Sequence, residues 1–213
     1  MTDGIRITGT HGNILIDSEV GINYCMTGRG TATLVRGSGS FAAAALADLV
    51  VSGQRPTLAV QGGNAQLTVM SSVNLGNGQW RFRVLGSSVN AGASFTYFVF
   101  DYPSSLSNYG VKTFSSGSVC TFDALRFPPK IMSATVRNDL PQGSYAVIVN
   151  QITSYMLPTA PAGQNYQYYV GYKTTPTGIT ALEISGFLWT DNITMVNSIS
   201  GAVLVVDVAN NFL

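Results

Sequence analysis

Histidine is scarce in this chain, which restricts the catalytic mechanisms that are open to it. His11 is the single histidine, so any Ser-His-Asp or Cys-His mechanism would have to use it as the general base. It lies beside Gly12 in a polar turn, where we expect an exposed loop residue. The chain also lacks a Gly-x-Ser-x-Gly sequence, the turn that presents the nucleophile of many hydrolases. The sequence therefore does not predict an enzyme that uses a serine or cysteine nucleophile.

The two cysteines, Cys25 and Cys120, are far apart in the sequence and form no Cys-x-x-Cys motif. A zinc site needs three or four His, Cys or carboxylate ligands, and one histidine with two separated cysteines does not supply them. A single disulfide between them is geometrically possible, but we favour two buried thiols that pack as small apolar side chains. The sequence predicts no metal and no cofactor.

Paired carboxylates are the remaining route to hydrolysis, because glycosidases place two of them several ångströms apart. The available carboxylates are Asp3, Asp17, Glu19, Asp48, Asp101, Asp123, Asp139, Glu183, Asp191 and Asp207. Asp17, Asp101 and Asp191 stand beside turn-forming residues at expected strand ends, where such side chains cap turns. We therefore expect structural carboxylates, and a polysaccharide hydrolase is the least favoured function.

The sequence contains no recognised motif for binding a phosphate-bearing ligand. Gly28-Arg29-Gly30 and Gly37-Ser38-Gly39 lack both the Lys-Ser/Thr pair of a P-loop and the GxGxxG spacing. We expect tight or flexible turns there. Nucleic-acid binding needs a basic excess, and 11 Lys+Arg against 10 Asp+Glu provide none.

A tyrosine stripe is the strongest candidate for ligand or partner contact. Tyr166, Tyr168 and Tyr172 have the same parity, so they share one face of an extended strand. If exposed, this stripe would suit sugar stacking or a protein interface, because tyrosine offers an apolar ring and a polar tip. The alternative is a half-buried strand that packs on the core, and the sequence leaves both open.

Alternating hydrophobicity predicts the strands that must position these residues. Ile5 and Ile7 alternate with polar residues, a polar turn follows over 9–13, and 14–16 form an apolar run. This pattern predicts an opening β-hairpin. The dipeptide Asn77-Gly78 is the strongest short hairpin signal, and it predicts antiparallel pairing of 67–73 with 80–85. In the second of these strands, Phe82 and its alternate neighbours share one face.

Trp80, Phe82 and Val84 are expected on the inner face of that strand, with Arg81 and Arg83 on the outer face. Further strands are predicted at 31–35, 57–61, 95–100, 119–122, 130–136, 145–150, 166–172, 181–189 and 203–208. Turn clusters separate most of them at a spacing of about 10 to 15 residues. The fold class predicted is all-β, an antiparallel β-sandwich or alternatively two packed β-lobes, with at most one short helix.

The segment Phe41–Leu49 is ambiguous. It contains four consecutive alanines, the strongest helix former, and Ser40 before them can act as an N-cap. A short helix and a buried strand are equally compatible with the segment.

A domain boundary is predicted near residues 122–130, where Pro128 and Pro129 stop strand pairing. It divides the chain into an N-terminal β-sandwich region, 1–122, and a C-terminal β region, 123–213. A second candidate boundary is the loop 157–165. One elaborated sandwich that joins both regions is favoured over two separate lobes.

Charged residues make up only 10% of the 213 residues, whereas about 25% is usual. The net charge of +1 and the 46% hydrophobic content exclude a disordered chain. A neutral, charge-poor monomer tends to associate, and interface cores are depleted of charge. The excess of eight arginines over three lysines agrees, because arginine is favoured at interfaces. We expect a permanent assembly; the alternative is a monomer with a Ser/Thr/Asn surface.

Two stretches carry a resemblance to a known family. Gly4-Ile5-Arg6-Ile7 is followed by a glycine-containing polar turn and then by Ile14-Leu15-Ile16-Asp17-Ser18. This start resembles the opening of small tail-tip and tail-fibre-associated proteins of tailed bacteriophages. Thr121-Phe122-Asp123, followed by Pro129-Lys130-Ile131, is similar to a Phe-Asp segment that recurs mid-chain in the same proteins. Together the stretches cover about 30 residues.

The resemblance implies a non-enzymatic virion structural protein of a tail tip or baseplate, and it supplies no catalytic residues. It implies a homo-oligomer, with a trimer as the first expectation, and other tail or baseplate proteins as partners. We expect assembly in the host cytoplasm, because no signal peptide and no membrane-spanning run is recognised. The alternative function is a glycan- or receptor-binding module for host attachment through the tyrosine stripe.

Overall fold

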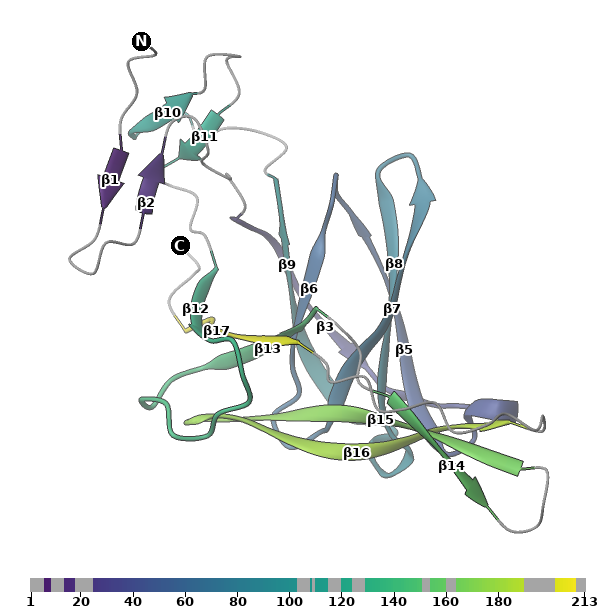
Figure 1. Cartoon of the computed structure of the whole chain (residues 1–213). Coiled ribbons are helices and arrows are strands. Elements are labelled where there is room, and N and C mark those ends of the chain that lie inside the picture. The colour runs from purple at the N-terminus through teal and green to yellow at the C-terminus, as the bar shows by residue number, and fades with distance from the viewer. Residues whose placement is uncertain are drawn as a thin grey trace.

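The computed structural model describes residues 6–8, 14–17, 25–102, 108, 110–114, 120–123, 129–150, 154–159, 164–189 and 202–209. Within these residues the chain is built from antiparallel strands and two short 3-10 turns, η1 (Gly39–Phe41) and η2 (Ser88–Asn90), without an α-helix. Figure 1 shows two large sheets packed against each other. The predicted all-β antiparallel sandwich is confirmed.

The first sheet has six strands in the described part of the chain and is called the six-stranded sheet. Its spatial order is β12 (Lys130–Ser133), β17 (Val203–Asp207), β13 (Tyr145–Val149), β6 (Thr57–Gln61), β9 (Ser94–Asp101) and β3 (Cys25–Thr33). Each neighbouring pair is antiparallel. β6 and β13 pair across the sequence boundary at 122/123, so both chain regions share this sheet.

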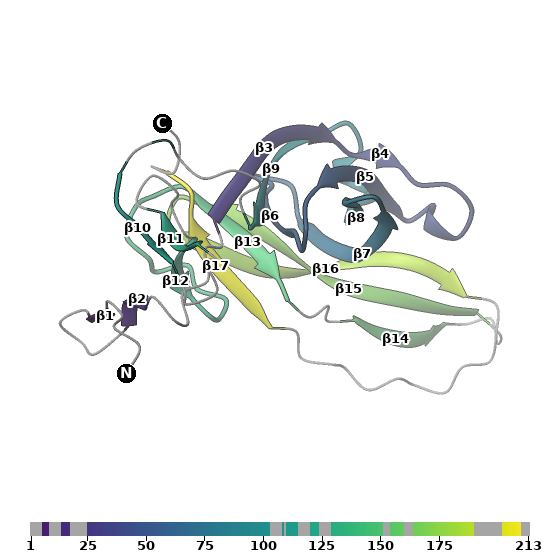
Figure 2. The same cartoon turned by 90° about the horizontal axis from the view of Figure 1, so that it is seen from above.

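The second sheet, called the seven-stranded sheet, also draws on both chain regions. Its described strands run in the order β14 (Ser154–Thr159), β15 (Gln164–Thr175), β7 (Leu67–Gly76), β8 (Gln79–Ser87), β5 (Ala44–Ser52) and β4 (Val35–Arg36), with β16 (Gly178–Trp189) paired to β15. The sheet curls into a half-barrel, so β16 also contacts β8 and β5. Figure 2 shows this curl from above.

Two short strand pairs lie beside each other near the N-terminus (Figure 1). β1 (Arg6–Thr8) pairs with β2 (Ile14–Asp17), and Ile7 lies opposite Ile16, which confirms the predicted opening hairpin. β10 (Lys112–Phe114) pairs with β11 (Cys120–Asp123). β2 contacts β11, so the two stretches that carry the family resemblance meet in space.

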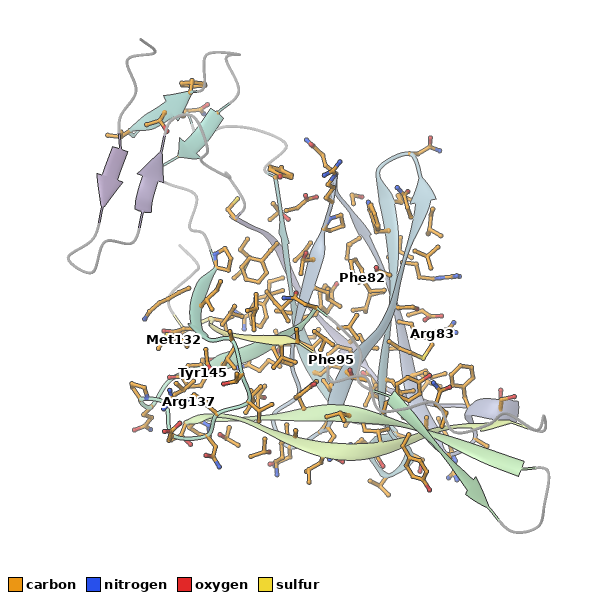
Figure 3. The ribbon with its side chains drawn as sticks, in the orientation of Figure 1. Phe82, Arg83, Phe95, Met132, Arg137 and Tyr145 are labelled. Carbon is orange, nitrogen blue, oxygen red and sulfur yellow. The ribbon has the colours of Figure 1, made fainter. Side chains whose placement is uncertain are left out.

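The β7–β8 hairpin also forms as predicted. Asn77 and Gly78 have φ angles of 52° and 71°, the left-handed pair that a type I′ turn requires. Phe82 and Val84 are buried on the inner face of β8, whereas Arg81 is exposed on the outer face. In Figure 3 the side chains of Phe82 and Arg83 lie on opposite sides of this strand.

The ambiguous segment 41–49 contributes to a strand, so the helix alternative is wrong. η1 ends at Phe41, and β5 then pairs with β8 along its whole length, from Ala44 opposite Ser87 to Ser52 opposite Gln79. The helix preference of alanine amounts to a few tenths of a kcal/mol per residue. A continuous strand ladder with one buried face outweighs that preference.

The core lies between the sheets and joins them into one sandwich. Phe82 of β8 and Phe95 of β9 come from opposite sheets and belong to the same buried cluster, and Tyr145 of β13 joins it. Figure 3 shows these side chains between the two layers. The Tyr145 hydroxyl is not left without a partner, because it donates to the carbonyl oxygen of Pro141. Burial of these aromatic side chains fixes how the two sheets stack.

Candidate functional site

The outer surface of the seven-stranded sheet has an uncovered half, which we call the open face: Asp48, Val50, Val73, Arg81 and Arg83. Strand register defines it. Val50, Arg81 and Val73 are directly opposite one another on β5, β8 and β7, and Asp48 is opposite Arg83 in the adjacent row. Opposed residues of an antiparallel ladder share one face. Val50 is 57% exposed and Val73 is 40% exposed, so the face presents apolar groups among arginines.

An ion pair holds the centre of the open face. The Arg83 Nε and Nη2 atoms donate to the two carboxylate oxygens of Asp48 at 2.7 and 2.6 Å. These hydrogen bonds hold the pKa of Asp48 below its usual range, although partial burial opposes the effect. The Arg83 guanidinium also lies 5.7 Å from the ring centroid of Phe41. Arg83 is therefore held in one orientation by Asp48 and Phe41.

The other half of the same surface is covered by β15 and β16. Tyr169 and Ile184 pack there against Ala44 and Leu85, and all four side chains are buried. Burial raises the pKa of Tyr169 to about 12, so this phenol stays protonated at physiological pH. The curl of the sheet thus divides its outer surface into a closed half and the open face.

The tyrosine stripe is only partly placed on the surface. Tyr172 is 3% exposed and belongs to the core between the sheets. The cause is the pairing of β15 with β7, which sets Tyr172 opposite the buried Leu67. Tyr172 therefore cannot contact a glycan or a partner, and at this residue the structure favours the alternative of a strand that packs on the core. Tyr168 is half-buried, and the side chain of Tyr166 lies outside the described residues.

The residues considered for catalysis are dispersed. His11 and Asp191 lie outside the described residues. Both cysteines are thiols; Cys25 is buried, as predicted, and Cys120 is partly buried. Among the residues that the structure describes, no three His, Cys, Asp or Glu side chains are grouped as metal ligands. In the same part of the chain, no helix has the length and apolar character needed to cross a bilayer.

Asp101 confirms the turn-capping interpretation for its position. It is buried, and its carboxylate accepts backbone N–H bonds from Gln54, Arg55 and Tyr102 at 2.6, 3.0 and 2.7 Å. A Cβ atom at Gly53 would overlap this carboxylate, which explains glycine there. Asp101 thus fastens the β5–β6 loop to the end of β9.

Two further carboxylates have basic partners on the surface. Asp139 accepts two hydrogen bonds from Arg137, at 2.8 and 2.6 Å. Asp207 accepts one from the Lys130 Nζ at 2.9 Å, across the β12–β17 ladder. These contacts occupy the carboxylates in structural roles, consistent with the expectation from the sequence.

A cleft of about 420 Å³, which we call the hydroxyl cleft, lies where β6 ends and β9 begins. The sequence reasoning missed it. Thr31 and Gln61 are both directly opposite Thr96, so the three side chains form one row across β3, β9 and β6. The residues that line it are Thr31, Gln61, Gly62, Gly63, Ser94, Phe95, Thr96, Gly143, Ser144, Tyr145, Thr174, Thr175 and Pro176. These residues are dispersed over five segments, and no motif links them.

Comparison of the chain with models of protein families, with curated proteins and with solved structures gives no match. The open face, the hydroxyl cleft and the chemistry of their side chains are therefore the features from which a function can be inferred.

Proposed function

We propose that this chain is a non-enzymatic structural subunit of a phage tail tip or baseplate. It acts by assembling with copies of itself and with neighbouring tail proteins. The observation that carries the proposal is the open face, where Val50 and Val73 are exposed beside Arg81 on a continuous three-strand surface. Apolar groups combined with arginine, on a rigid support, are typical of protein interfaces.

Two further observations support this function. The segments with the phage-tail resemblance, residues 4–18 and 121–131, are far apart in sequence, yet β2 and β11 within them are in contact. Two segments that lie together in the fold can serve one common role. The chain as a whole is poor in charge, as expected for a subunit with permanent neighbours.

The open face is suited to a second copy of the chain. It carries both signs of charge, so Arg81 of one copy can lie against Asp48 of the next while Val50 and Val73 are covered. Arg81 forms no ion pair with the described residues of its own chain. A contact of the open face with the same face of a second copy is two-fold symmetric, so it joins copies in pairs, and the trimer that the resemblance implies would need a second contact surface on each copy.

Size-exclusion chromatography with light scattering on the purified chain tests the proposal. We expect an oligomer, and we expect Val50→Asp to raise its dissociation constant about tenfold or more, because a charge would be buried in the contact. Val111→Asp is the matched control, since Val111 is 65% exposed but lies before β10, away from the open face. A monomer that also binds no tail component would contradict the proposal.

Host attachment through the tyrosine stripe is the second candidate function, and it now depends on Tyr166 and Tyr168 alone. A glycan array with wild type and Tyr168→Ala tests it. Loss of binding in this variant would support the stripe, and unchanged binding would exclude Tyr168 as a contact.

A further inference from the structure

The hydroxyl cleft is neutral throughout. Its lining residues are threonine, serine, glutamine, glycine, proline and two aromatics, and none of them carries a charge at physiological pH. A phosphate, carboxylate or ammonium ligand would find no opposite charge there. The volume of about 420 Å³ lies in the range of small-ligand sites. The chemistry therefore selects a small neutral ligand.

Several hydrogen-bonding groups in the hydroxyl cleft are available to such a ligand. Gln61 Nε2 donates to Ser144 Oγ at 2.7 Å, which leaves the Gln61 Oε1 acceptor and the Ser144 hydroxyl proton. The hydroxyl groups of Thr31 and Thr96 make no side-chain hydrogen bond with the residues described. Each hydroxyl can both donate and accept, and this matches a ligand that is itself rich in hydroxyls.

The backbone around the hydroxyl cleft is fixed before any ligand binds. The Gly63 N–H donates to Thr174 Oγ1 at 2.9 Å, which joins the β6–β7 turn to the end of β15. The Gly143 N–H donates to the carbonyl oxygen of Pro176 at 2.8 Å, which joins the segment before β13 to the β15–β16 turn. A preformed site loses less conformational entropy on binding.

We infer that the hydroxyl cleft binds a neutral saccharide. Thr31, Thr96, Gln61 and Ser144 provide donors and acceptors for sugar hydroxyls. The apolar C–H face of a pyranose ring can pack on the ring of Pro176 and on the threonine methyl groups that border the cleft. Phe95 and Tyr145 also line the cleft, but both are buried, so neither offers an exposed ring for stacking. We therefore expect a weak site, with a Kd of about 1 mM for a monosaccharide.

The inference does not depend on assembly, but assembly would strengthen its effect. Several copies of a weak site in one particle bind a surface polymer by multivalency, and avidity can exceed single-site affinity by about 100-fold or more. Saccharide binding to the isolated chain and the oligomeric mass are separate measurements, so either proposal can fail alone.

Saturation-transfer difference NMR on the full chain tests the inference, with glucose, galactose, mannose and N-acetylglucosamine as probes and glucuronic acid as the charged comparison. We expect transfer to at least one neutral sugar and at least tenfold weaker binding of glucuronic acid. Thr96→Val replaces the hydroxyl by a methyl group of the same size and is expected to weaken sugar binding about tenfold.

Three other variants keep the test decisive. Thr31→Phe fills the cleft from the exposed edge strand β3, where the substitution leaves the core intact, and it should abolish transfer. Tyr168→Ala and Val50→Asp lie outside the lining residues and should bind as wild type does. The inference is overturned if no neutral sugar shows transfer, if glucuronic acid binds equally well, or if Thr31→Phe still binds. Loss of binding in Tyr168→Ala would assign the sugar to the tyrosine stripe instead.

Discussion

The outer surfaces of the two sheets differ although both are built from antiparallel strands with alternating side chains. On the six-stranded sheet, outside the hydroxyl cleft, part of the outer surface is a buried apolar cluster, with Met26 and Leu204 packed against it. Its members are Ala59, Phe98, Phe100, Ala146, Ile148, Val206 and Val208. On the seven-stranded sheet the open face exposes Val50 and Val73 beside charged side chains.

The difference shows that the low charge of the chain has two physical origins. The second half of β9 is apolar on both faces: Val99 faces the core between the sheets, whereas Phe98 and Phe100 face the outer cluster. A strand segment that is buried on both sides leaves little room for charges within it, and the one charged residue of β9, Asp101, stands at the end of the strand. Only surfaces like the open face, where apolar side chains are exposed together, are candidates for contact with a neighbour. A low overall charge is therefore a weaker sign of assembly than the place on the surface where apolar side chains are exposed.

Phe100→Ala is expected to reduce the unfolding free energy more than the other substitutions, and it tests whether the outer cluster of the six-stranded sheet is buried. Phe100 is fully buried in the outer cluster of the six-stranded sheet, and loss of a buried phenyl group leaves a cavity that costs about 3–5 kcal/mol of unfolding free energy. Urea denaturation followed by circular dichroism measures it. A cost below about 1 kcal/mol would show that this surface is open in solution, and the contrast between the two outer surfaces would then be lost.

Asp101→Ala is expected to have the next largest effect, about 3 kcal/mol. The substitution leaves the backbone N–H groups of Gln54, Arg55 and Tyr102 without their shared charged acceptor, and hydrogen bonds to a charged group contribute more to stability than neutral ones. Asp101→Asn keeps one acceptor oxygen and should lose about half as much. Equal stability of the alanine variant and wild type, measured by the same urea denaturation, would refute the role of Asp101 as a fastener of the β5–β6 loop.

A matched pair of valines compares the two surfaces directly. Val206 is fully buried in the outer cluster, whereas Val50 is 57% exposed on the open face. Removal of two methyl groups should cost about 2 kcal/mol for Val206→Ala and less than about 0.5 kcal/mol for Val50→Ala in the dissociated chain. Thermal unfolding at low protein concentration measures both. If Val50→Ala costs as much as Val206→Ala at every concentration, the open face is covered within a single copy.

The sequence predicted the fold through features that are local. Alternation places Phe82 and Val84 inside β8, and the Asn77-Gly78 turn fixes the register of its hairpin. The segment 41–49 was ambiguous because alanine is compatible with both a helix and a buried strand. The short strands β10 and β14 were missed, since three to six residues carry too little alternation to be distinguished from loops.

The functional surfaces were less predictable because they depend on contacts between distant segments. Tyr172 has the right parity for an exposed stripe, but its pairing with Leu67 of β7 buries it. The hydroxyl cleft joins Thr31, Thr96 and Gln61 only through the order of β3, β9 and β6 in the sheet. Serine and threonine are common throughout the chain, so their types alone gave no signal.

The Asp48–Arg83 pair gives the smallest expected effect and the sharpest test of the open face. The pKa of Asp48 is lowered in the folded chain by the hydrogen bonds from Arg83, so the pair stabilises the fold above the unfolded carboxyl pKa of about 3.9. This stability is lost as the pH falls through the lower folded pKa. Because the Asp48 side chain is 41% exposed, solvent screening limits the contribution to about 0.5 kcal/mol.

Urea denaturation of wild type and Asp48→Asn near pH 7 and near pH 2 measures this contribution, with Asp139→Asn as the control for an exposed pair away from the open face. At low protein concentration the two stability differences should be similarly small and should decrease as the pH falls. At high concentration a second copy would cover the open face, and the Asp48→Asn cost should then rise to about 3 kcal/mol because Arg83 is left buried without its partner. A cost that does not change with concentration would place the open face in solvent and contradict assembly through it.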